Sequence, residues 1–239
     1  MRRAAIFLLG SVLLAGWPGV PNAETLPLPP NLVAFDSDEG EALLVSADER
    51  DDFFALSSHF VTQINPAFCG PASIAMVLNA LGVPRPPSDM TLGLGMFDQV
   101  NVFTEQTEAV KPQASIMRGG MTLDQVGGVL ATYGVTADVH HAGDSNVDEF
   151  RDLATVALGD AESDFVLVNY LRKALGQESG GHISPLAAYD IETDRFLILD
   201  VSRYKYPPVW VTTADLFAAM NTPDSDANDL TRGYVIVSQ

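Results

Sequence analysis

The chain is poor in cysteine and in basic residues. It has one cysteine in 239 residues, and only 13 lysines and arginines stand against 31 aspartates and glutamates. The single cysteine excludes an intrachain disulfide, so its thiol is either a small buried apolar group or a reactive one. The net charge of −18 makes nucleic acid and anionic lipid poor partners, because both require a basic surface. No apolar run reaches the roughly 18 residues that a membrane-spanning helix needs.

Residues 1–23 follow the pattern of a secretory signal peptide. Arg2 and Arg3 precede a short apolar stretch at residues 4–16, and helix breakers follow it ahead of an expected cleavage site after Ala23. Residues 24–239 are long enough to bury a core and suit one domain or two closely packed lobes. We therefore predict an exported protein, periplasmic or secreted. In that oxidising compartment the lone thiol is either kept for its chemistry or sheltered in the core.

Acidic residues and histidines offer no convincing metal site in the sequence. The acidic run between residues 36 and 52 is interpreted as a solvated surface, because it lacks the glycine-framed spacing of a cation loop. His140 and His141 are adjacent on a predicted strand, so their side chains point to opposite faces and do not share one ion. His59 has no partner at a ligand spacing. We predict no metal site in the protein itself.

The periodicity of apolar residues changes from helical to extended along the chain. A helix is predicted from the cysteine to Gly82, residues 83–120 form a loop region, and capping boxes at Thr122 and Asn146 open two further helices. Strands are predicted at residues 135–140, 165–170, 182–189, 195–201, 210–211 and 234–237, with a short helix at 213–220. This order predicts an α+β fold with a helical N-terminal lobe, a C-terminal antiparallel sheet and a cleft between them.

Cys69 lies where a reactive thiol would be placed. It opens the predicted helix in the sequence Phe-Cys-Gly-Pro-Ala-Ser at residues 68–73. The positive end of the helix dipole favours the thiolate, which is the nucleophilic form. A lone cysteine is more often a buried structural residue, so the nucleophile hypothesis depends on the residues that accompany it.

His182 and Asp200 supply an accompanying base and carboxylate. They lie on the two arms of one predicted hairpin, His182 near the start of the first arm and Asp200 near the end of the second. Residues at such positions face each other across an antiparallel ladder. Asp200 follows apolar residues, where a buried charge requires a partner. We predict that His182 takes the proton of Cys69 and that Asp200 orients the imidazole.

Gln63 extends this arrangement. It lies six residues before Cys69, so its side-chain amide can share a space with the Cys69 backbone N–H and form an oxyanion hole. The alternative is an ordinary loop glutamine. The chain order of glutamine, cysteine, histidine and carboxylate is typical of papain-like thiol enzymes.

Four segments resemble the phytochelatin synthase family, and most closely its short bacterial members. They are residues 63–81, 168–173, 181–189 and 199–211, the last of which reads Leu-Asp-Val-Ser-Arg-Tyr-Lys-Tyr-Pro-Pro-Val-Trp-Val. The resemblance covers essentially the whole chain after residue 23. It implies a papain-like two-lobe fold, a triad of Cys69, His182 and Asp200, and Gln63 at the oxyanion hole. It also implies glutathione as the substrate, attacked at the bond to its glycine.

A γ-glutamyl group carries an α-carboxylate and an α-ammonium, so its pocket needs one cation and at least one acceptor. Arg232 is a rational ligand for the carboxylate, Asp224 is available for the ammonium, and Tyr234 is placed to line the pocket. Asn169 and Arg172 fall in a matched segment and are further candidates for substrate binding. Each of the first three has a plain alternative, namely a surface ion pair, a loop cap and a core residue.

The predicted reaction releases glycine and leaves a γ-glutamylcysteinyl thioester on Cys69. Plant members carry a cysteine-rich C-terminal half that is absent here, so we expect hydrolysis to dominate over transfer to a second glutathione, which yields phytochelatin. No cofactor is required for acylation, and cadmium or zinc enters as a glutathione thiolate complex. Two alternatives stay open: a peptidase of another specificity on the same scaffold, and a non-catalytic acidic metal-binding protein. A homodimer also stays open.

Overall fold

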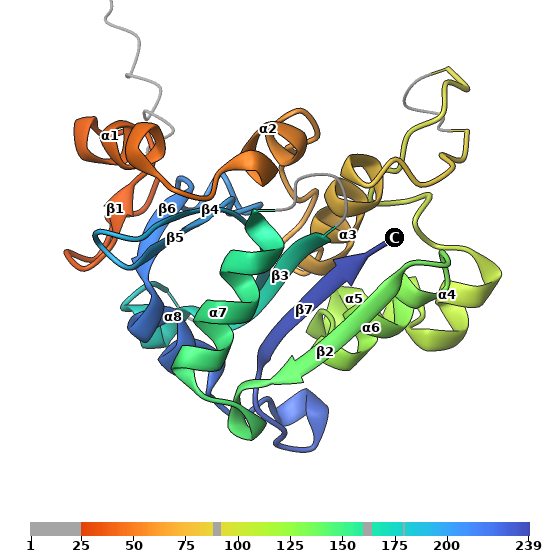
Figure 1. The fold of residues 1–239 in the computed structure, drawn as a ribbon. Helices are drawn as coiled ribbons and strands as arrows, with labels where there is room; N and C mark the ends of the chain where they lie inside the picture. The colour runs from red at the N-terminus through yellow and green to blue at the C-terminus, as the bar shows by residue number, and fades with distance from the viewer. Residues whose placement is uncertain (1–24, 88–91, 160–163, 179) are drawn as a thin grey trace, which may run out of the picture.

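The computed structural model describes residues 25–87, 92–159, 164–178 and 180–239, so the predicted signal peptide lies outside the described residues (Figure 1). The helices are α1 (Asp38–Ser46), α2 (Asp51–Ser57), α3 (Cys69–Ala80), α4 (Glu105–Val110), α5 (Gln113–Gly119), α6 (Leu123–Ala131), α7 (Val147–Leu158) and α8 (Thr213–Met220). The strands are β1 (Val33–Ala34), β2 (Thr136–His141), β3 (Asp164–Leu171), β4 (Gly181–Asp190), β5 (Arg195–Ile198), β6 (Val209–Thr212) and β7 (Gly233–Ser238). Short 3₁₀ segments are η2 (Ala142–Asp144), η3 (Arg172–Leu175) and η4 (Ser225–Ala227).

Within the described ranges the strands form one seven-stranded antiparallel sheet in the order β1-β6-β5-β4-β3-β7-β2. Successive side chains of a strand point to opposite faces, so each face of the sheet has its own core. Phe165 and Leu167 of β3 pack in the core that contains α3 and α6, whereas Val166 and Val168 pack in the core that contains α7 and α8. Figure 1 shows α7 lying across the near face of the sheet. The α+β class is confirmed.

Helix boundaries follow the capping signals in the sequence. Thr122 accepts a hydrogen bond from the Gln125 backbone N–H, and Gln125 accepts one from the Thr122 N–H, so the predicted capping box of α6 is confirmed. The Asn146 side chain accepts from backbone N–H groups in the first turn of α7. Gly82, just after α3, has a φ of 69°, which a glycine adopts without steric cost.

Helices were missed in two stretches of the sequence. The predicted loop region 83–120 contains α4 and α5, and α4 opens with a box in which Thr104 and Thr107 exchange hydrogen bonds instead of the usual threonine and glutamate. The acidic run contains α1 and α2, whose first turns carry carboxylates that the helix dipole favours. Asp52 of this run is fully buried, so the interpretation as a solvated surface is wrong at that position.

Strand β2 and helix α8 were predicted, and the sheet contains one strand that was not predicted, β1. Strands β1 and β2 come from the first 141 residues and form the two edges of the sheet, and α8 belongs to the C-terminal half. The second arm of the predicted hairpin, β5, ends at Ile198, and a bulge interrupts its pairing with β4 between Leu186 and Ala188. Asp200 therefore lies just beyond the ladder, two residues after the end of β5.

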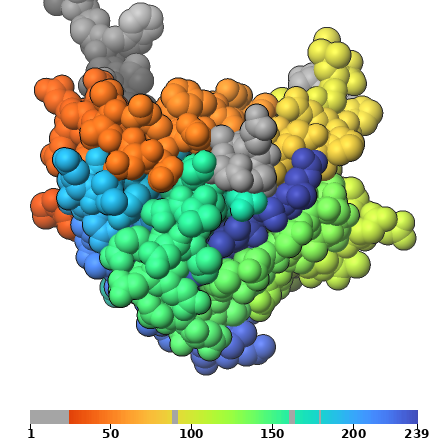
Figure 2. Space-filling view, in the orientation of Figure 1, coloured from red at the N-terminus to blue at the C-terminus, as the bar shows by residue number. Residues whose placement is uncertain are grey.

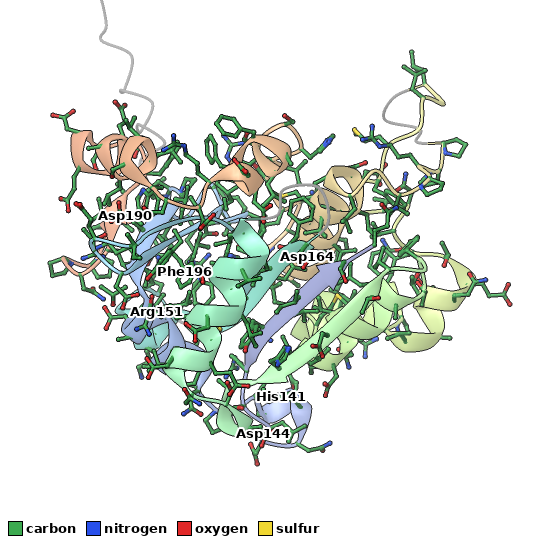
Figure 3. All side chains as sticks on the ribbon, viewed as in Figure 1. His141, Asp144, Arg151, Asp164, Asp190 and Phe196 are labelled. Atoms are coloured by element: carbon green, nitrogen blue, oxygen red, sulfur yellow. The ribbon has the colours of Figure 1, made fainter. Side chains whose placement is uncertain are left out.

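Helix α7 is fastened to the sheet by apolar and ionic contacts. Phe150 meets Phe196 of β5 at a ring distance of 5.3 Å, and Arg151 donates to both carboxylate oxygens of Asp194 at 2.9 and 3.0 Å. Figure 3 labels Arg151 and Phe196 at this junction. In the space-filling view, α7 and β2 occupy the lower part of the near face with β7 visible between them (Figure 2). No helix among the described residues has the length and apolar character to cross a membrane.

Candidate active site

Cys69 is the first residue of α3 and is only 7% exposed. The helix is buried along almost its whole length, which agrees with its apolar residues on every side. The Ser73 hydroxyl donates to the Ile183 carbonyl at 3.2 Å and holds the first turn of α3 against β4. This contact brings Cys69 beside the start of β4, where His182 lies.

His182 lies between Cys69 and Asp200. Its ring shares a hydrogen bond with the Cys69 thiol, and its Nε2 is 2.8 Å from Oδ1 of Asp200. Because Nε2 faces the carboxylate, Nδ1 is the nitrogen left for the thiol. The side chains of His182 and Asp200 are 4% and 0% exposed, so water screens this pair little. The structure places the proposed nucleophile, base and orienting carboxylate in one buried series.

The ionisation of the three groups is set by competition between burial and charge. Burial opposes the thiolate, but the hydrogen bond and charge of His182 and the Ile183 and Gly70 backbone groups lower the pKa of Cys69. Burial also opposes the imidazolium, yet the Asp200 carboxylate raises the pKa of His182. Burial of Asp200 is outweighed by His182 and Arg172, which lower its pKa to about 2. These shifts favour a thiolate–imidazolium pair.

Arg172, predicted as a substrate ligand, is instead paired with Asp200 behind the triad. Its Nη2 is 2.7 Å from Oδ2 of Asp200, and its Nη1 donates to Gln177 at 2.7 Å. The guanidinium also lies over the Tyr206 ring at 5.2 Å. Arg172 is 3% exposed and its charge is already neutralised. We therefore assign it to holding the Asp200 carboxylate rather than to binding substrate.

Two neighbours of His182 were missed in the sequence. The Ser184 hydroxyl is 3.0 Å from His182 Nε2 and also accepts from the Val201 backbone N–H at 3.3 Å. Tyr170 is the cross-strand partner of His182 on β3 and meets the imidazole edge-on at a ring distance of 5.7 Å. Ser184 follows His182 by two residues on one strand, and that spacing places both side chains on the same face. This two-residue spacing on a predicted strand could have identified Ser184 from the sequence.

A cavity of about 90 Å³ opens beside Cys69 and His182. Its other lining residues come from three places: the Gly119–Met121 segment before α6, the β3–β4 pair, and the segment that leads into β7. Arg232, Asp224 and Asn169, all predicted as substrate ligands, line this cavity. Asp226 lines it as well and was not predicted. The cavity therefore joins the thiol to one cation, two carboxylates and one amide.

Unused hydrogen-bond donors lie among the residues of this cavity. Arg232 directs Nη1 to Thr222 and Pro223, and its Nη2 is 3.5 Å from Oδ1 of Asp224. Within the described ranges, Nε of Arg232 and Nδ2 of Asn169 are buried without a hydrogen-bond partner. A buried donor without a partner costs about 1–3 kcal/mol, so both groups are suited to an acceptor that enters the cavity.

Tyr234, predicted to line the pocket, lies in the core on the α7 side of the sheet. It is fully buried, stacks on His140 at 4.7 Å and meets Phe150 at 5.0 Å. It does not appear among the residues that line the cavity with Cys69. The alternation of β7 explains this, because Gly233 and Val235 face the other side from Tyr234. Tyr234 is therefore a packed core residue, which was the alternative considered for it in the sequence.

Gln63 lies in a second cavity, of about 350 Å³, that shares Gly181 and His182 with the first. It is 3% exposed, and its Nε2 donates to Asn65 O and to the Tyr204 hydroxyl, both at 2.9 Å. Its backbone N–H donates to Val201 O at 2.9 Å. Both amide hydrogens thus have acceptors in this structure. To donate a hydrogen bond in an oxyanion hole, Gln63 must give up its hydrogen bond to Asn65 or to Tyr204.

His140 and His141 are each paired with a neighbouring carboxylate. His140 contacts Asp138 at 2.9 Å, and His141, at the end of β2 in Figure 3, contacts Asp124 at 3.1 Å and the Thr231 carbonyl. The described part of the chain holds no group of three or more histidines, cysteines or carboxylates arranged to hold a metal ion.

Comparison with known proteins gives one consistent result. The model of the phytochelatin synthase family matches residues 23–234. The chain is 36% identical to glutathione gamma-glutamylcysteinyltransferase 3 of Lotus japonicus, over 90% of this chain and 43% of that protein. It is 35% identical to glutathione gamma-glutamylcysteinyltransferase 1 of Triticum aestivum, over 90% of this chain and 42% of that protein. It spans less than half the length of these two curated relatives.

Similarity to a solved structure is weak. A double glycine motif protease from an AMS/PCAT transporter, in complex with the leader peptide, matches with a TM-score of 0.36 and 15% identity, over 74% of this chain and 89% of that one. A score this low supports no conclusion about the fold. The sequence relationship is much stronger, because the family model runs through every segment that carries the triad and the cavity. The chain belongs to the phytochelatin synthase family.

Proposed function

We propose that the protein is a thiol enzyme that acts on glutathione. Cys69 attacks the carbonyl of the cysteinyl–glycine bond, glycine leaves, and a γ-glutamylcysteinyl thioester forms on Cys69. One observation carries the proposal: the buried Cys69–His182–Asp200 series opens into a cavity that also holds Arg232 and Asp224. A nucleophile beside a matched cation and carboxylate suits a substrate with a zwitterionic γ-glutamyl head.

The α-carboxylate of that head is assigned to Arg232 and Asn169. Nε of Arg232 and Nδ2 of Asn169 are buried N–H donors free to receive it. Asp224 is assigned to the α-ammonium, since its carboxylate also lines the cavity and is only 3.5 Å from the Arg232 guanidinium. Each charge of the substrate head then lies beside an opposite charge of the protein, which offsets the desolvation cost of burying these charges.

His182 moves the proton in both halves of the acylation. It holds the Cys69 proton as imidazolium and delivers it to the glycine nitrogen as the cysteinyl–glycine bond breaks. Asp200 stabilises the imidazolium, at 2.8 Å from Nε2. The negative oxygen of the tetrahedral intermediate is assigned to the backbone N–H of Cys69 and to an amide N–H of Gln63, released from Tyr204 or from Asn65.

We propose that water resolves most of the thioester, to give γ-glutamylcysteine, and that a second glutathione takes a smaller share, to give phytochelatin. A net charge of −18 repels an anionic acceptor. Cadmium or zinc enters as a bis-thiolate complex of glutathione, so it is substrate rather than resident cofactor. Chromatography of both products, with and without cadmium, tests this division. Phytochelatin in excess of γ-glutamylcysteine in metal-free buffer would contradict it.

Mass spectrometry of the protein after brief mixing with glutathione tests the reaction itself. We expect an adduct with the mass of γ-glutamylcysteinyl on Cys69 and none on Cys69→Ser. Asp224→Asn and Arg232→Gln are expected to retain thiol alkylation by iodoacetamide while forming less adduct. A mixed disulfide with intact glutathione, with no acyl adduct and no released glycine, would refute the function.

Export to the periplasm or medium is also part of the proposal, on the pattern of residues 1–23. N-terminal sequencing of the protein recovered from the exported fraction tests it. We expect the chain to begin at Glu24, and a cytoplasmic chain that retains Met1 or Arg2 would contradict export.

A further inference from the structure

The backbone on both sides of Gln63 is held by one side chain, the carboxamide of Gln99. Gln99 Nε2 donates to the Thr62 carbonyl at 3.0 Å, and the Ile64 N–H donates to Gln99 Oε1 at 2.9 Å. Gln99 is 7% exposed. One side chain thus makes the pair of hydrogen bonds that a neighbouring strand would make with residues on either side of Gln63.

The opposite side of the same segment is held by the residue that follows Asp200. The Gln63 N–H donates to the carbonyl of this residue, Val201, at 2.9 Å. Three consecutive residues therefore have a backbone group fixed, two by Gln99 and one by the Asp200 segment. The direction in which the Gln63 side chain leaves the backbone is set by these contacts.

The loop that carries Gln99 is itself anchored to the helix of the nucleophile. Asn79 of α3 donates to the Phe97 carbonyl at 2.8 Å and accepts from the Phe97 N–H at 3.0 Å. Two successive backbone N–H groups, those of Val100 and Asn101, donate to Asp98 Oδ1 at 2.8 Å each. Hydrogen bonds therefore link α3 to this loop, and this loop to the backbone on either side of Gln63.

We propose that Gln99 is a positioning residue for the oxyanion hole, acting only through Gln63. This inference rests on the proposed function, in which Gln63 donates to the negative oxygen of the intermediate. Gln99 lines a different cavity, with Thr62 and Ile64, from those described that contain Cys69, so we assign it no contact with the substrate. Its contribution is to keep the Gln63 amide within hydrogen-bond reach, since a displacement of about 1 Å is enough to lose much of its effect.

Gln99→Met tests the proposal, because methionine has a similar length and cannot bridge the two backbone groups. Loss of a single oxyanion donor costs about 10²–10³ in kcat, so we expect misplacing one to lower the acylation rate roughly tenfold. The aldehyde analogue of γ-glutamyl-S-methylcysteine adds to the thiolate as a hemithioacetal and reports on the same hole. Its affinity is expected to fall by a similar factor, while the pH profile of iodoacetamide alkylation stays unchanged.

A double-mutant cycle separates positioning from general damage. If Gln99 acts only through Gln63, Gln63→Ala with Gln99→Met is no slower than Gln63→Ala alone. Asn146→Ala is the control for general loss of stability, since the Asn146 side chain accepts from two backbone N–H groups at the start of α7, and α7 packs in the core on the other face of the sheet from Cys69. It is expected to lower the melting temperature while affecting the aldehyde equally with and without Gln63. Gln99→Glu keeps an oxygen that accepts from the Ile64 N–H, so its aldehyde affinity is expected to fall less than that of Gln99→Met. It serves as the second variant if Gln99→Met folds poorly.

Two outcomes overturn the inference. One is an undiminished aldehyde affinity in folded Gln99→Met and Gln99→Glu. The other is an equal loss from Gln99→Met in the wild-type and Gln63→Ala backgrounds, which would make Gln99 a structural residue. A failure of the proposed function is distinguishable from both, since the wild-type protein itself would then form no acyl adduct with glutathione and release no glycine.

Discussion

Cys69, His182 and Asp200 share buried hydrogen bonds, so the ionisation of each depends on the next. We expect the iodoacetamide alkylation rate of Cys69 to rise with a midpoint well below the ordinary thiol value of about 8.5, because His182 lowers the pKa of the thiol. In His182→Ala, burial is opposed only by the backbone groups of Ile183 and Gly70, so the midpoint is expected to move upward from the wild-type midpoint. A wild-type midpoint at or above about 8.5 would rule out the ion pair.

Asp200 also contributes to stability, because it forms a buried ion pair with Arg172. Asp200→Asn is expected to lower turnover less than Cys69→Ala or His182→Ala, since an amide still bonds to the imidazole but stabilises its charge less. It is also expected to lower the free energy of unfolding by about 3–5 kcal/mol, since one partner of a buried pair is left alone. Arg151→Gln, which breaks a more exposed pair, is the control, with a loss under about 1 kcal/mol. Equal losses of stability would contradict the assignment.

The same carboxylate predicts how stability depends on acid. The pKa of Asp200 in the folded protein is about 2, below the ordinary value of about 3.9, so its stabilisation is complete above the ordinary value. It is lost as the pH falls from there through about 2 and amounts to roughly 2–3 kcal/mol. Urea unfolding between pH 5 and 2 should therefore show a steeper loss for the wild type than for Asp200→Asn. Parallel curves would contradict this.

At the scale of elements, α6 approaches β2 closely at a glycine. A Cβ built on Gly127 would lie 2.4 Å from Cγ2 of Val139, closer than real Cβ contacts allow. Gly127→Ala is therefore expected to cost about 1–3 kcal/mol, despite the higher helix propensity of alanine. Adding Val139→Ala makes room and is expected to restore part of the loss, which denaturant unfolding of both single variants and the double variant measures. A neutral or stabilising Gly127→Ala would show that the two elements can separate without cost.

Element positions also explain the local errors of the sequence analysis. Alternation placed Tyr234 on a strand, but whether its face was the cavity side or the α7 side depended on which helices cover the sheet. The contact between His182 and Asp200 was predicted from a regular hairpin, whereas the chain reaches it beyond the end of β5 and past a bulge. In both cases the periodicity was right, and the packing of distant elements decided the outcome.

The molecule as a whole is strongly acidic, with a net charge of −18, and glutathione is an anion. Repulsion acts over the Debye length, which is about 30 Å at 0.01 M ionic strength and about 8 Å at 0.15 M. We expect kcat/KM for glutathione to rise several-fold as sodium chloride is raised through this range, with most of the change in KM. Iodoacetamide, which is neutral, serves as the control and should show little change. A kcat/KM for glutathione that falls with salt would indicate a locally positive entrance.

The sequence alone determined the helix of Cys69, the capping of α6 and the α+β class, and it selected Cys69, His182 and Asp200 as the candidates for nucleophile, base and carboxylate, because these depend on periodicity, caps and local motifs. Only the tertiary structure decided which charged residues meet. Arg172 pairs with Asp200 and leaves Arg232 with Asp224 to line the cavity, and Gln99 bridges the backbone around Gln63. The physical reason is that side-chain pairing between segments far apart in the chain follows from how sheet and helices pack, and one sequence has many charged residues that could pair but a single packed arrangement.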